Sequence, residues 1–303
     1  MNRYIFASLL HIDKRNFGSP NNKNNSPDSY LRQIKLLNST LYNTFGQELV
    51  VITNDKEQVE SFFADEAMSP KVINYEPTFQ PPINLTFYGA HFKLEAFKAG
   101  LKLLSKGAAD YFCLLDCDII ANMSFDQQQE WLISKSDIAV YDISDYVFPA
   151  YGVREIWENL ELVGGVSYTN PKWFGGEFLM ATEKGLKELI TECEHTLELY
   201  LKYHSELHHS GDEMFVSSAL NNIIEQGDIN VVEIGTSKVI GRHWAQLNYI
   251  SFDFFKTCNF IHCPGSKQIL EVMSSMNASK NTRLYMLKIW QIIVRIGRRV
   301  RGL

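Results

Sequence analysis

Two aspartates stand two positions apart directly after a short apolar run. Asp116 and Asp118 follow the segment Tyr-Phe-Cys-Leu-Leu of residues 111–115, which has the composition of a buried strand. Residues two apart in an extended segment project to the same face, so both carboxylates can approach one cation. Carboxylate oxygens suit Mg²⁺ or Mn²⁺, and such a cation can neutralise a leaving diphosphate. The pattern predicts a divalent metal site; the alternative interpretation is an acidic turn.

A second group of functional residue types occupies residues 261–267, Ile-His-Cys-Pro-Gly-Ser-Lys. The neutral imidazole of His262 suits a third ligand position on Mn²⁺. Gly265 permits close approach of the backbone, and Lys267 offers a point charge to phosphate. An ordinary turn histidine is the alternative. A zinc site built from Cys258, His262 and Cys263 is a weaker one, since no fourth ligand stands at a suitable spacing.

Asp212 and Glu213 form a third candidate group. Ser210-Gly211-Asp212-Glu213 matches the Ser-x-x-Glu capping box, which predicts a helix that begins near Asp212. A carboxylate at a helix N-terminus is rigidly placed and stays ionised, as required of a group that stabilises an oxocarbenium-like transition state. We therefore expect the pair to be catalytic as well as capping.

Two further segments are candidates for ligand contact. The run Trp-Phe-Gly-Gly-Glu-Phe of residues 173–178 would bring Gly176 and Glu177 against a sugar ring, because glycine lets the backbone approach and aromatic faces stack on pyranoses. A strand bulge is the alternative. Lys93 lies in a predicted helix over residues 88–105, where it either contacts phosphate or is solvated.

Strand-like and helical patterns alternate along the first half of the chain. Strands are predicted at residues 4–10, 48–53 and 111–115, with helices at 30–43 and 88–105. This alternation predicts an α/β fold with a mostly parallel sheet and helices on both faces. Ligands of such sheets bind at the carboxyl ends of the strands, where Asp55 and Asp116 fall. After residue 125 the predicted elements are a strand at 173–181, helices at 183–206 and from 212, and extended chain at 229–240.

Composition describes an ordinary globular protein whose charge is uneven. Hydrophobic residues make up 45% of the 303 residues and charged residues 21%. Residues 280–303 carry seven basic side chains and no acid, which leaves 22 basic and 35 acidic residues in the remainder. The acidic body, residues 1–275, argues against nucleic acid as a partner. The five cysteines have no framework spacing and indicate reduced thiols.

The basic C-terminal segment, residues 280–303, has the pattern of an amphipathic helix. Met286, Ile289, Ile293, Ile296 and Val300 share one face. Lys288, Arg295 and Arg299 are expected on the opposite face. This pattern is typical of a helix that lies on an anionic membrane surface, with a partner-binding helix as the alternative. It predicts peripheral attachment at the inner face of the cytoplasmic membrane, in a bacterial protein.

Together these motifs resemble glycosyltransferases of the GT-A fold, a Rossmann-like sheet flanked by helices. The Asp-x-Asp strand, the Phe-Gly-Gly of residues 174–176 and the His-Ser-Gly-Asp-Glu of residues 209–213 are similar to the retaining blood-group-type α-1,3-galactosyltransferases. The His-x-x-Gly-x-Lys of residues 262–267 resembles the corresponding element of the glycogenin and lipopolysaccharide-galactosyltransferase family, with the lysine one residue early.

The resemblance implies a metal-dependent, retaining transfer of a hexose from a UDP-sugar to a saccharide or lipid-linked acceptor in surface-polysaccharide or lipopolysaccharide synthesis. It implies Mn²⁺ (or Mg²⁺) on Asp116, Asp118 and His262, Ser8 and Asp55 near the nucleoside, and Glu213 as nucleophile or cation stabiliser beside Asp212. The alternatives are a sugar-phosphate nucleotidyltransferase, whose glycine-rich basic loop is not found after the first strand, and a non-enzymatic metal- or sugar-binding module.

Overall fold

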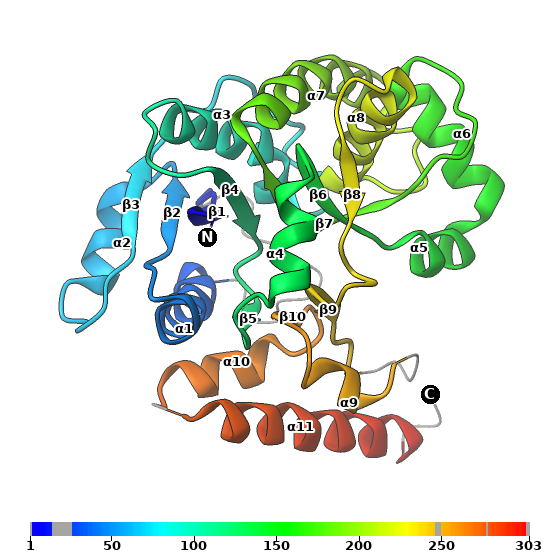
Figure 1. Cartoon of the computed structure of the whole chain (residues 1–303). Helices are drawn as coiled ribbons and strands as arrows, with labels where there is room; N and C mark the ends of the chain where they lie inside the picture. Colours follow the sequence, from blue (N-terminus) through cyan, green and yellow to red (C-terminus); the bar gives the residue numbers. More distant parts are fainter. Residues whose placement is uncertain (1, 14–25, 246–249, 277, 301–303) are drawn as a thin grey trace.

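The computed structural model describes residues 2–13, 26–245, 250–276 and 278–300. Its centre is a seven-stranded sheet in the order β3-β2-β1-β4-β7-β6-β8, in which only β7 runs antiparallel to its neighbours (Figure 1). The strands are β1 (Tyr4–Leu10), β2 (Val50–Thr53), β3 (Lys71–Asn74), β4 (Tyr111–Leu115), β6 (Ile138–Asp142), β7 (Phe174–Ala181) and β8 (Val231–Glu233). The prediction of an α/β fold with a mostly parallel sheet is confirmed.

Most of the helices flank this sheet, and the last three pack together below it (Figure 1). The helices are α1 (Pro27–Phe45), α2 (Lys56–Phe63), the 3₁₀ helix η1 (Tyr88–Phe92), α3 (Lys93–Leu104), α4 (Gln127–Ser134), α5 (Ser144–Tyr151), α6 (Val153–Gly164), α7 (Glu183–Tyr203), α8 (Asp212–Gln226), α9 (Phe252–Phe255), α10 (Lys267–Ser274) and α11 (Lys280–Val300). In Figure 1, α3, α7 and α8 lie above the sheet and α1 lies below it. None of the helices within the described ranges is long and apolar enough to cross a bilayer.

Local sequence explains where several of these elements start and stop. All five residues of β4 are buried, which accounts for its continuous apolar run. The side chain of Ser26 accepts the N–H of Asp28 at the start of α1, and Gly46, with φ of 68°, ends that helix in the left-handed conformation. Residues 125–165, where the sequence pattern is irregular, form α4, β6, α5 and α6.

A second, three-stranded sheet matters more for the site. It contains β5 (Ile119–Ala121), β10 (Phe260–His262) and β9 (Ile240–Arg242) in that order. In its register His262 pairs with Ile119 on one side and with Arg242 on the other. The small sheet therefore sets the segment that follows Asp118 directly beside His262. The predicted extended chain at 229–240 is split, since β8 joins the large sheet and β9 the small one.

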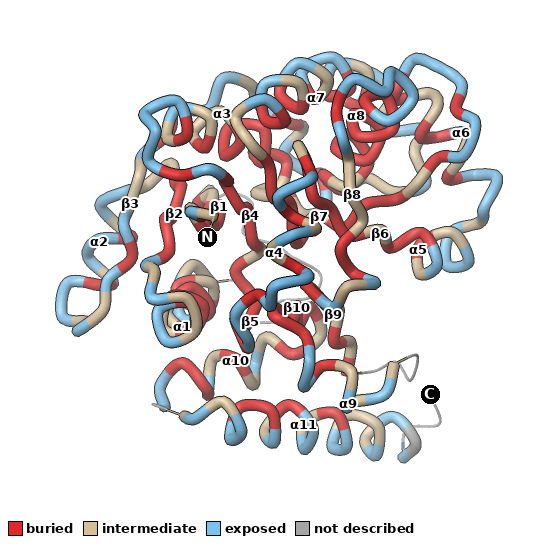
Figure 2. The backbone as a smooth tube through the Cα atoms, viewed as in Figure 1, coloured by how far each residue is buried: buried red, intermediate tan, exposed pale blue. Residues whose placement is uncertain are grey.

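The hydrophobic interior has two parts. Figure 2 colours all buried residues red. The larger cluster fills the space between the seven-stranded sheet and its helices. The smaller one lies between α1, α9, α10 and α11, and includes Leu270, Met273, Leu284 and Leu287. The basic C-terminal segment is thus a helix that packs one face on the rest of the fold.

Candidate active site

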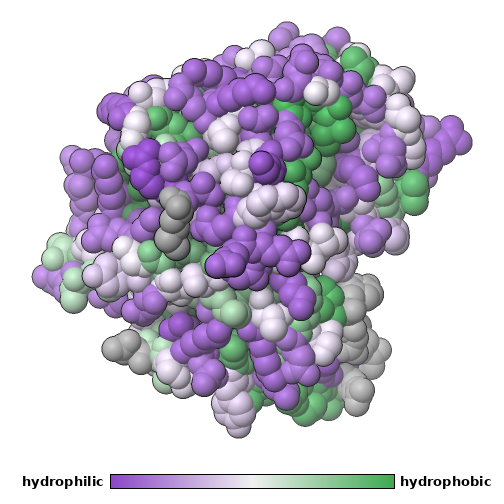
Figure 3. All heavy atoms as spheres, in the orientation of Figure 1, coloured by the Kyte–Doolittle hydropathy of each residue, from purple (hydrophilic) through white to green (hydrophobic). Residues whose placement is uncertain are grey.

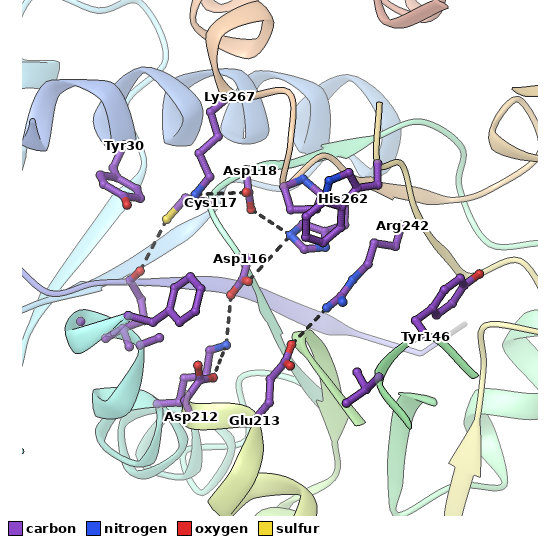
Figure 4. A pocket seen from close by; sticks show the side chains of 18 of the residues that line it. Tyr30, Asp116, Cys117, Asp118, Tyr146, Asp212, Glu213, Arg242, His262 and Lys267 are labelled. Carbon is purple, nitrogen blue, oxygen red and sulfur yellow. Dashed lines mark hydrogen bonds and ion pairs between the residues drawn. The ribbon is translucent and has the colours of Figure 1, made fainter. Parts of the chain in front are cut away.

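A cavity of about 450 Å³ opens at the carboxyl ends of β1 and β4. Its walls come from distant parts of the chain: Leu10 at the end of β1 and His11 after it, Tyr88 of η1, Tyr146 and Tyr151 of α5, Trp244 after β9 and Gln291 of α11. Asp116, Asp118, Asp212, Glu213, His262 and Lys267 all face this cavity (Figure 4). The location is the one expected for ligands of parallel sheets.

Asp116, Asp118 and His262 form a group that could bind a metal ion. One ligand atom from each residue lies within 4.8 Å of the other two. The Nε2 atom of His262 is 3.2 Å from an oxygen of Asp118 and 4.0 Å from an oxygen of Asp116. The aspartates occupy a turn between β4 and β5, so the expectation that an extended segment aligns them is wrong. They converge because the small sheet brings His262 against them.

The described part of the chain contains no zinc-ligand group built from Cys258, His262 and Cys263. Cys258 and Cys263 are buried free thiols, and neither joins His262 in a group with metal-ligand spacing. Burial raises the pKa of both thiols above its ordinary value, which disfavours the thiolate that zinc requires.

His262 is oriented by a buried carboxylate. Its Nδ1 atom lies 3.1 Å from Oε1 of Glu177, a residue with no exposed surface. Since a carboxylate accepts, Nδ1–H donates to Glu177, and Nε2 is left to face the two aspartates. Metal-ligating histidines are held in this way by a second hydrogen bond. Glu177 therefore supports the metal group from behind and does not reach a ligand in the cavity, which corrects the prediction that it contacts the sugar.

The pKa values show a site that is short of positive charge. Burial, together with Asp118 and Asp212, raises the pKa of Asp116 in spite of the nearby Lys93. Burial opposes ionisation of Asp118, but Lys267 and His262 hold its pKa below the ordinary range. Burial alone would lower the pKa of His262, yet the carboxylates of Asp118 and Glu177 raise it to about 9.

The charges around the cavity do not cancel. The ion-paired cluster contains the carboxylates of Asp116, Asp118, Glu177, Asp212 and Glu213, and the cations of Lys93, Arg242 and Lys267. With His262 neutral, as metal ligation requires, two negative charges are in excess among these described residues; without a metal, the raised pKa of His262 leaves a proton that offsets one of them. A divalent cation would neutralise that excess, so the donor set and the charge both fit a hard metal such as Mn²⁺ or Mg²⁺.

Lys93 links three elements at the base of the cavity. Its Nζ atom lies 3.2 Å from Asp116 and 2.7 Å from Asp212, and it donates to the carbonyl of Gly176 at 2.7 Å. Burial would lower its pKa, but Asp116 and Asp212 raise it above the ordinary value. The side chain is only 5% exposed, so the prediction of a solvated helix lysine is excluded. Gly176 acts through its backbone: its N–H donates to Glu213 and its carbonyl accepts from Lys93.

Lys267 begins α10 on the other side of the metal group. Its Nζ atom is 3.3 Å from Asp118 and 5.0 Å from the centre of the Tyr30 ring. It lines the cavity, as expected for a cation that contacts phosphate. Gly265 is half-buried in the preceding turn and is not among the cavity-lining residues.

Glu213 is held as an ionised carboxylate by tertiary contacts. It accepts from Nε1 of Trp173 at 3.0 Å and pairs with Arg242 at 3.0 Å. Burial would raise its pKa, but Arg242 is chief among the groups that lower it overall. The capping-box prediction is wrong: Gly211 is the N-cap of α8, and no side chain caps that helix. Asp212 and Glu213 point into the cavity instead.

Arg242 is the principal residue that sequence reasoning missed. Its guanidinium makes two 2.7 Å bonds to Glu177 and a third contact to Glu213. Through Glu177 it joins the metal group to Glu213. The available signal was an arginine directly after the apolar run of residues 239–241, since a buried charge must have a partner.

The prediction that Ser8 and Asp55 lie near the nucleoside is not supported, because neither side chain is in the cavity. Ser8 is fully buried and donates to the carbonyl of Leu115 at 2.7 Å inside the sheet. Asp55 accepts the N–H of Gln58 as the N-cap of α2. Neither residue lines the cavity. The wall near the end of β1 is aromatic instead: His11 stacks on Phe92 with ring centres 3.8 Å apart, beside Tyr88.

Neither the protein-family models nor the curated proteins compared with this chain provide a match. The fold and the site therefore define it by class: an α/β protein with a mostly parallel sheet, and an Asp-x-Asp turn beside a histidine at the carboxyl edge of that sheet.

His243, which follows Arg242, makes a pH-dependent contribution to stability. Both of its ring nitrogens are buried without a hydrogen-bond partner in the described part of the structure, between the rings of Phe252 and Phe255. Burial, followed by the charge of Arg295, lowers the pKa of His243 to about 4. Below the ordinary pKa of 6.5 the unfolded chain therefore binds the proton more readily than the folded chain.

We expect the free energy of unfolding to fall by about 3 kcal/mol from this residue as the pH drops from about 6.5 to about 4, with no such contribution above that range. His243→Phe should make the unfolding free energy depend less on pH. Part of the dependence should remain in the variant, because burial also lowers the pKa of His91. Urea unfolding of both proteins at several pH values measures the difference. Identical slopes would contradict the role given to His243.

Proposed function

We propose that this protein is a metal-dependent glycosyltransferase of the GT-A type, which transfers a hexose from a UDP-sugar to a saccharide or lipid-linked acceptor with retention of configuration. One observation supports this most: a single cavity holds the group of Asp116, Asp118 and His262 together with the ionised carboxylate of Glu213. The sequence resemblance to retaining GT-A enzymes adds to it. Synthesis of a surface polysaccharide or lipopolysaccharide is the proposed context.

In this proposal Asp116, Asp118 and His262 hold Mn²⁺ or Mg²⁺. The bound metal would supply Lewis-acid neutralisation of the diphosphate that leaves. Lys267 lines the cavity 3.3 Å from Asp118 and adds a fixed cation on the phosphate side. Burial keeps these charges in a low-dielectric setting, where they act more strongly than in water.

The remaining groups are assigned by position. The uracil nucleoside lies along Leu10, His11 and Tyr88, at the end of β1, in place of the contacts first expected from Ser8 and Asp55. Glu213 faces the donor hexose and stabilises the positive charge that develops at its anomeric carbon. Asp212 is positioned beside it by Lys93, and Arg242 keeps Glu213 ionised.

The direct experiment is a panel of nucleotide sugars in titration calorimetry with Mn²⁺ and, as the control, with a chelator in place of the metal. The proposal predicts metal-dependent binding of a UDP-hexose and slow donor hydrolysis without acceptor. Formation of a nucleotide sugar from a nucleoside triphosphate and a sugar phosphate would contradict the proposal and indicate a nucleotidyltransferase. Binding of a nucleotide sugar without turnover, whichever acceptor is added, would indicate a sugar-binding module.

Gly176 provides a further test of the site geometry. A Cβ atom at this position would lie 2.6 Å from Nζ of Lys93 and 2.8 Å from Oδ2 of Asp212. Gly176→Ala should therefore push this buried ion pair apart and lower kcat by about tenfold to a hundredfold. Initial transfer rates measure the loss. Gly297→Ala is the matched control, since no atom lies within 4 Å of its added Cβ; equal rates in both variants would refute the argument.

A further inference from the structure

The helix α11 has two different faces. One face packs on the body of the protein through Leu284, Leu287 and Gln291, which are 8%, 0% and 6% exposed. In Figure 2 the turns of α11 are red toward α9 and α10 and pale blue on the opposite side. The packed face completes a hydrophobic cluster with α10, so α11 keeps a defined orientation relative to the fold.

The opposite face is apolar and exposed. Its side chains are spaced 4, 3, 1, 3 and 4 residues apart and form one continuous row, which we call the isoleucine stripe: Tyr285, Ile289, Ile292, Ile293, Ile296 and Val300. The three isoleucines at its centre are 48%, 54% and 57% exposed, and Val300 is 82% exposed. Six large apolar side chains in one exposed row indicate a binding surface rather than scattered surface hydrophobics.

Basic residues accompany this row. Lys288 and Arg295 are seven positions apart on the helix, which puts them along one flank of the stripe. The prediction that the basic residues occupy the opposite face is corrected, because that face packs on the body through Leu284 and Leu287. No acidic residue occurs between residues 280 and 303, whereas the rest of the chain has 35 acidic and 22 basic residues. Figure 3 shows hydrophobic atoms beside hydrophilic ones along the lower edge of the molecule, where α11 lies.

We propose that the isoleucine stripe binds the surface of an anionic lipid bilayer. Charge complementarity selects this occupant. The remainder of the chain is acidic overall and would repel an anionic surface or a second copy of itself, whereas residues 280–303 carry seven basic side chains and no acid and would attract an anionic surface. The stripe spans about 22 Å at 1.5 Å per residue and lies along the helix, as in helices that rest in the headgroup region.

The same helix forms part of the cavity wall. Gln291, on the packed face, lines the cavity together with Ile250 and Phe255. One helix diameter, about 10 Å, therefore separates the cavity from the surface that the stripe would contact. This step rests on the proposed function: an enzyme so oriented would take its acceptor from the bilayer, which favours a lipid-linked saccharide over a free one.

The test is sedimentation of the full chain with vesicles of phosphatidylcholine alone and of an equal mixture of phosphatidylcholine and phosphatidylglycerol. Binding is expected only to the mixed vesicles and should weaken at high salt. Ile293→Glu combined with Ile296→Glu should lower the bound fraction about tenfold or more, and Lys288→Glu about threefold. Ile293, Ile296 and Lys288 are all exposed, so the unfolding curves of both variants should match that of the wild type.

The matched control is Val153→Glu combined with Val166→Glu, which places the same charges on exposed apolar sites of α6 and the following loop. It should bind vesicles as the wild type does. Equal sedimentation of the Ile293/Ile296 variant, or no binding of the wild type to mixed vesicles, overturns the proposal. So does a concentration-dependent dimer that the same variant abolishes, since the stripe would then contact a second copy. UDP-sugar binding measured without vesicles reports on the proposed function separately.

Discussion

Replacement of both Asp116 and Asp118 by alanine should reduce hexose transfer by on the order of 10³-fold or more, and should remove Mn²⁺ binding. These residues supply two of the three ligand atoms that converge within 4.8 Å. Without them the site loses its oxygen donors and keeps Lys93, Lys267 and Arg242. Transfer rates at saturating donor and calorimetry with Mn²⁺ alone measure the two effects. Chelator should reduce the wild type to a similar rate.

A loss of folding must be separated from a loss of chemistry. Lys93 keeps Asp212 and the carbonyl of Gly176 as partners in the double variant, whereas Lys267 loses the carboxylate that lies 3.3 Å away. Removal of one partner of a buried pair costs about 3 to 5 kcal/mol. The isosteric Asp116→Asn and Asp118→Asn variants keep the shape, with one acceptor oxygen in place of two at each position, and should also lose Mn²⁺. Full activity of the alanine variant in chelator would end the metal-based account.

Glu213→Gln should lower kcat by about 10² to 10³-fold and leave KM for the donor nearly unchanged. The carboxylate is proposed to act on charge that exists only in the transition state, so its neutralisation affects the rate more than ground-state binding. Steady-state kinetics with a UDP-hexose provides the measurement. Glu225→Gln is the matched control, because it makes the same change on the same helix, where Glu225 accepts the exposed N–H of Thr169.

The stability of this variant distinguishes a catalytic from a structural role. Glu213 accepts from Trp173 and from Gly176 and pairs with Arg242, and a glutamine has one acceptor oxygen for these donors. We expect a loss of about 1 to 3 kcal/mol in the free energy of unfolding. A variant with a lower melting temperature but the wild-type kcat would show that Glu213 has only a structural role, in contacts with Trp173, β7 and Arg242.

Much of the metal group was predictable because its signals are local. Continuous burial marks β4 as a strand, and Asp116 follows it at the edge where parallel sheets bind ligands. His262 and Lys267 stand in one short segment with suitable residue types. Each of these inferences needs only neighbouring residues, whose spacing the backbone geometry sets.

Other roles depend on residues far apart in the sequence. Glu177 and Arg242 are 65 positions apart, yet they form the ion pair that joins His262 to Glu213. The Ser-x-x-Glu pattern predicted a cap because it contains no information on Arg242 or Trp173, which hold the Glu213 carboxylate instead. Register in the small sheet decides these contacts, and register arises from packing of the whole fold.

The sequence by itself determined the fold class, the residue types that could bind a metal and the amphipathic character of residues 280–303, because periodicity and side-chain chemistry are properties of short segments. Only the tertiary structure decided which face of α11 is covered. The packing of Leu284 and Leu287 on α10 leaves the isoleucine stripe exposed and turns Gln291 into the cavity. A helix pattern specifies which residues share a face, whereas the partner of each face depends on elements that are distant along the chain.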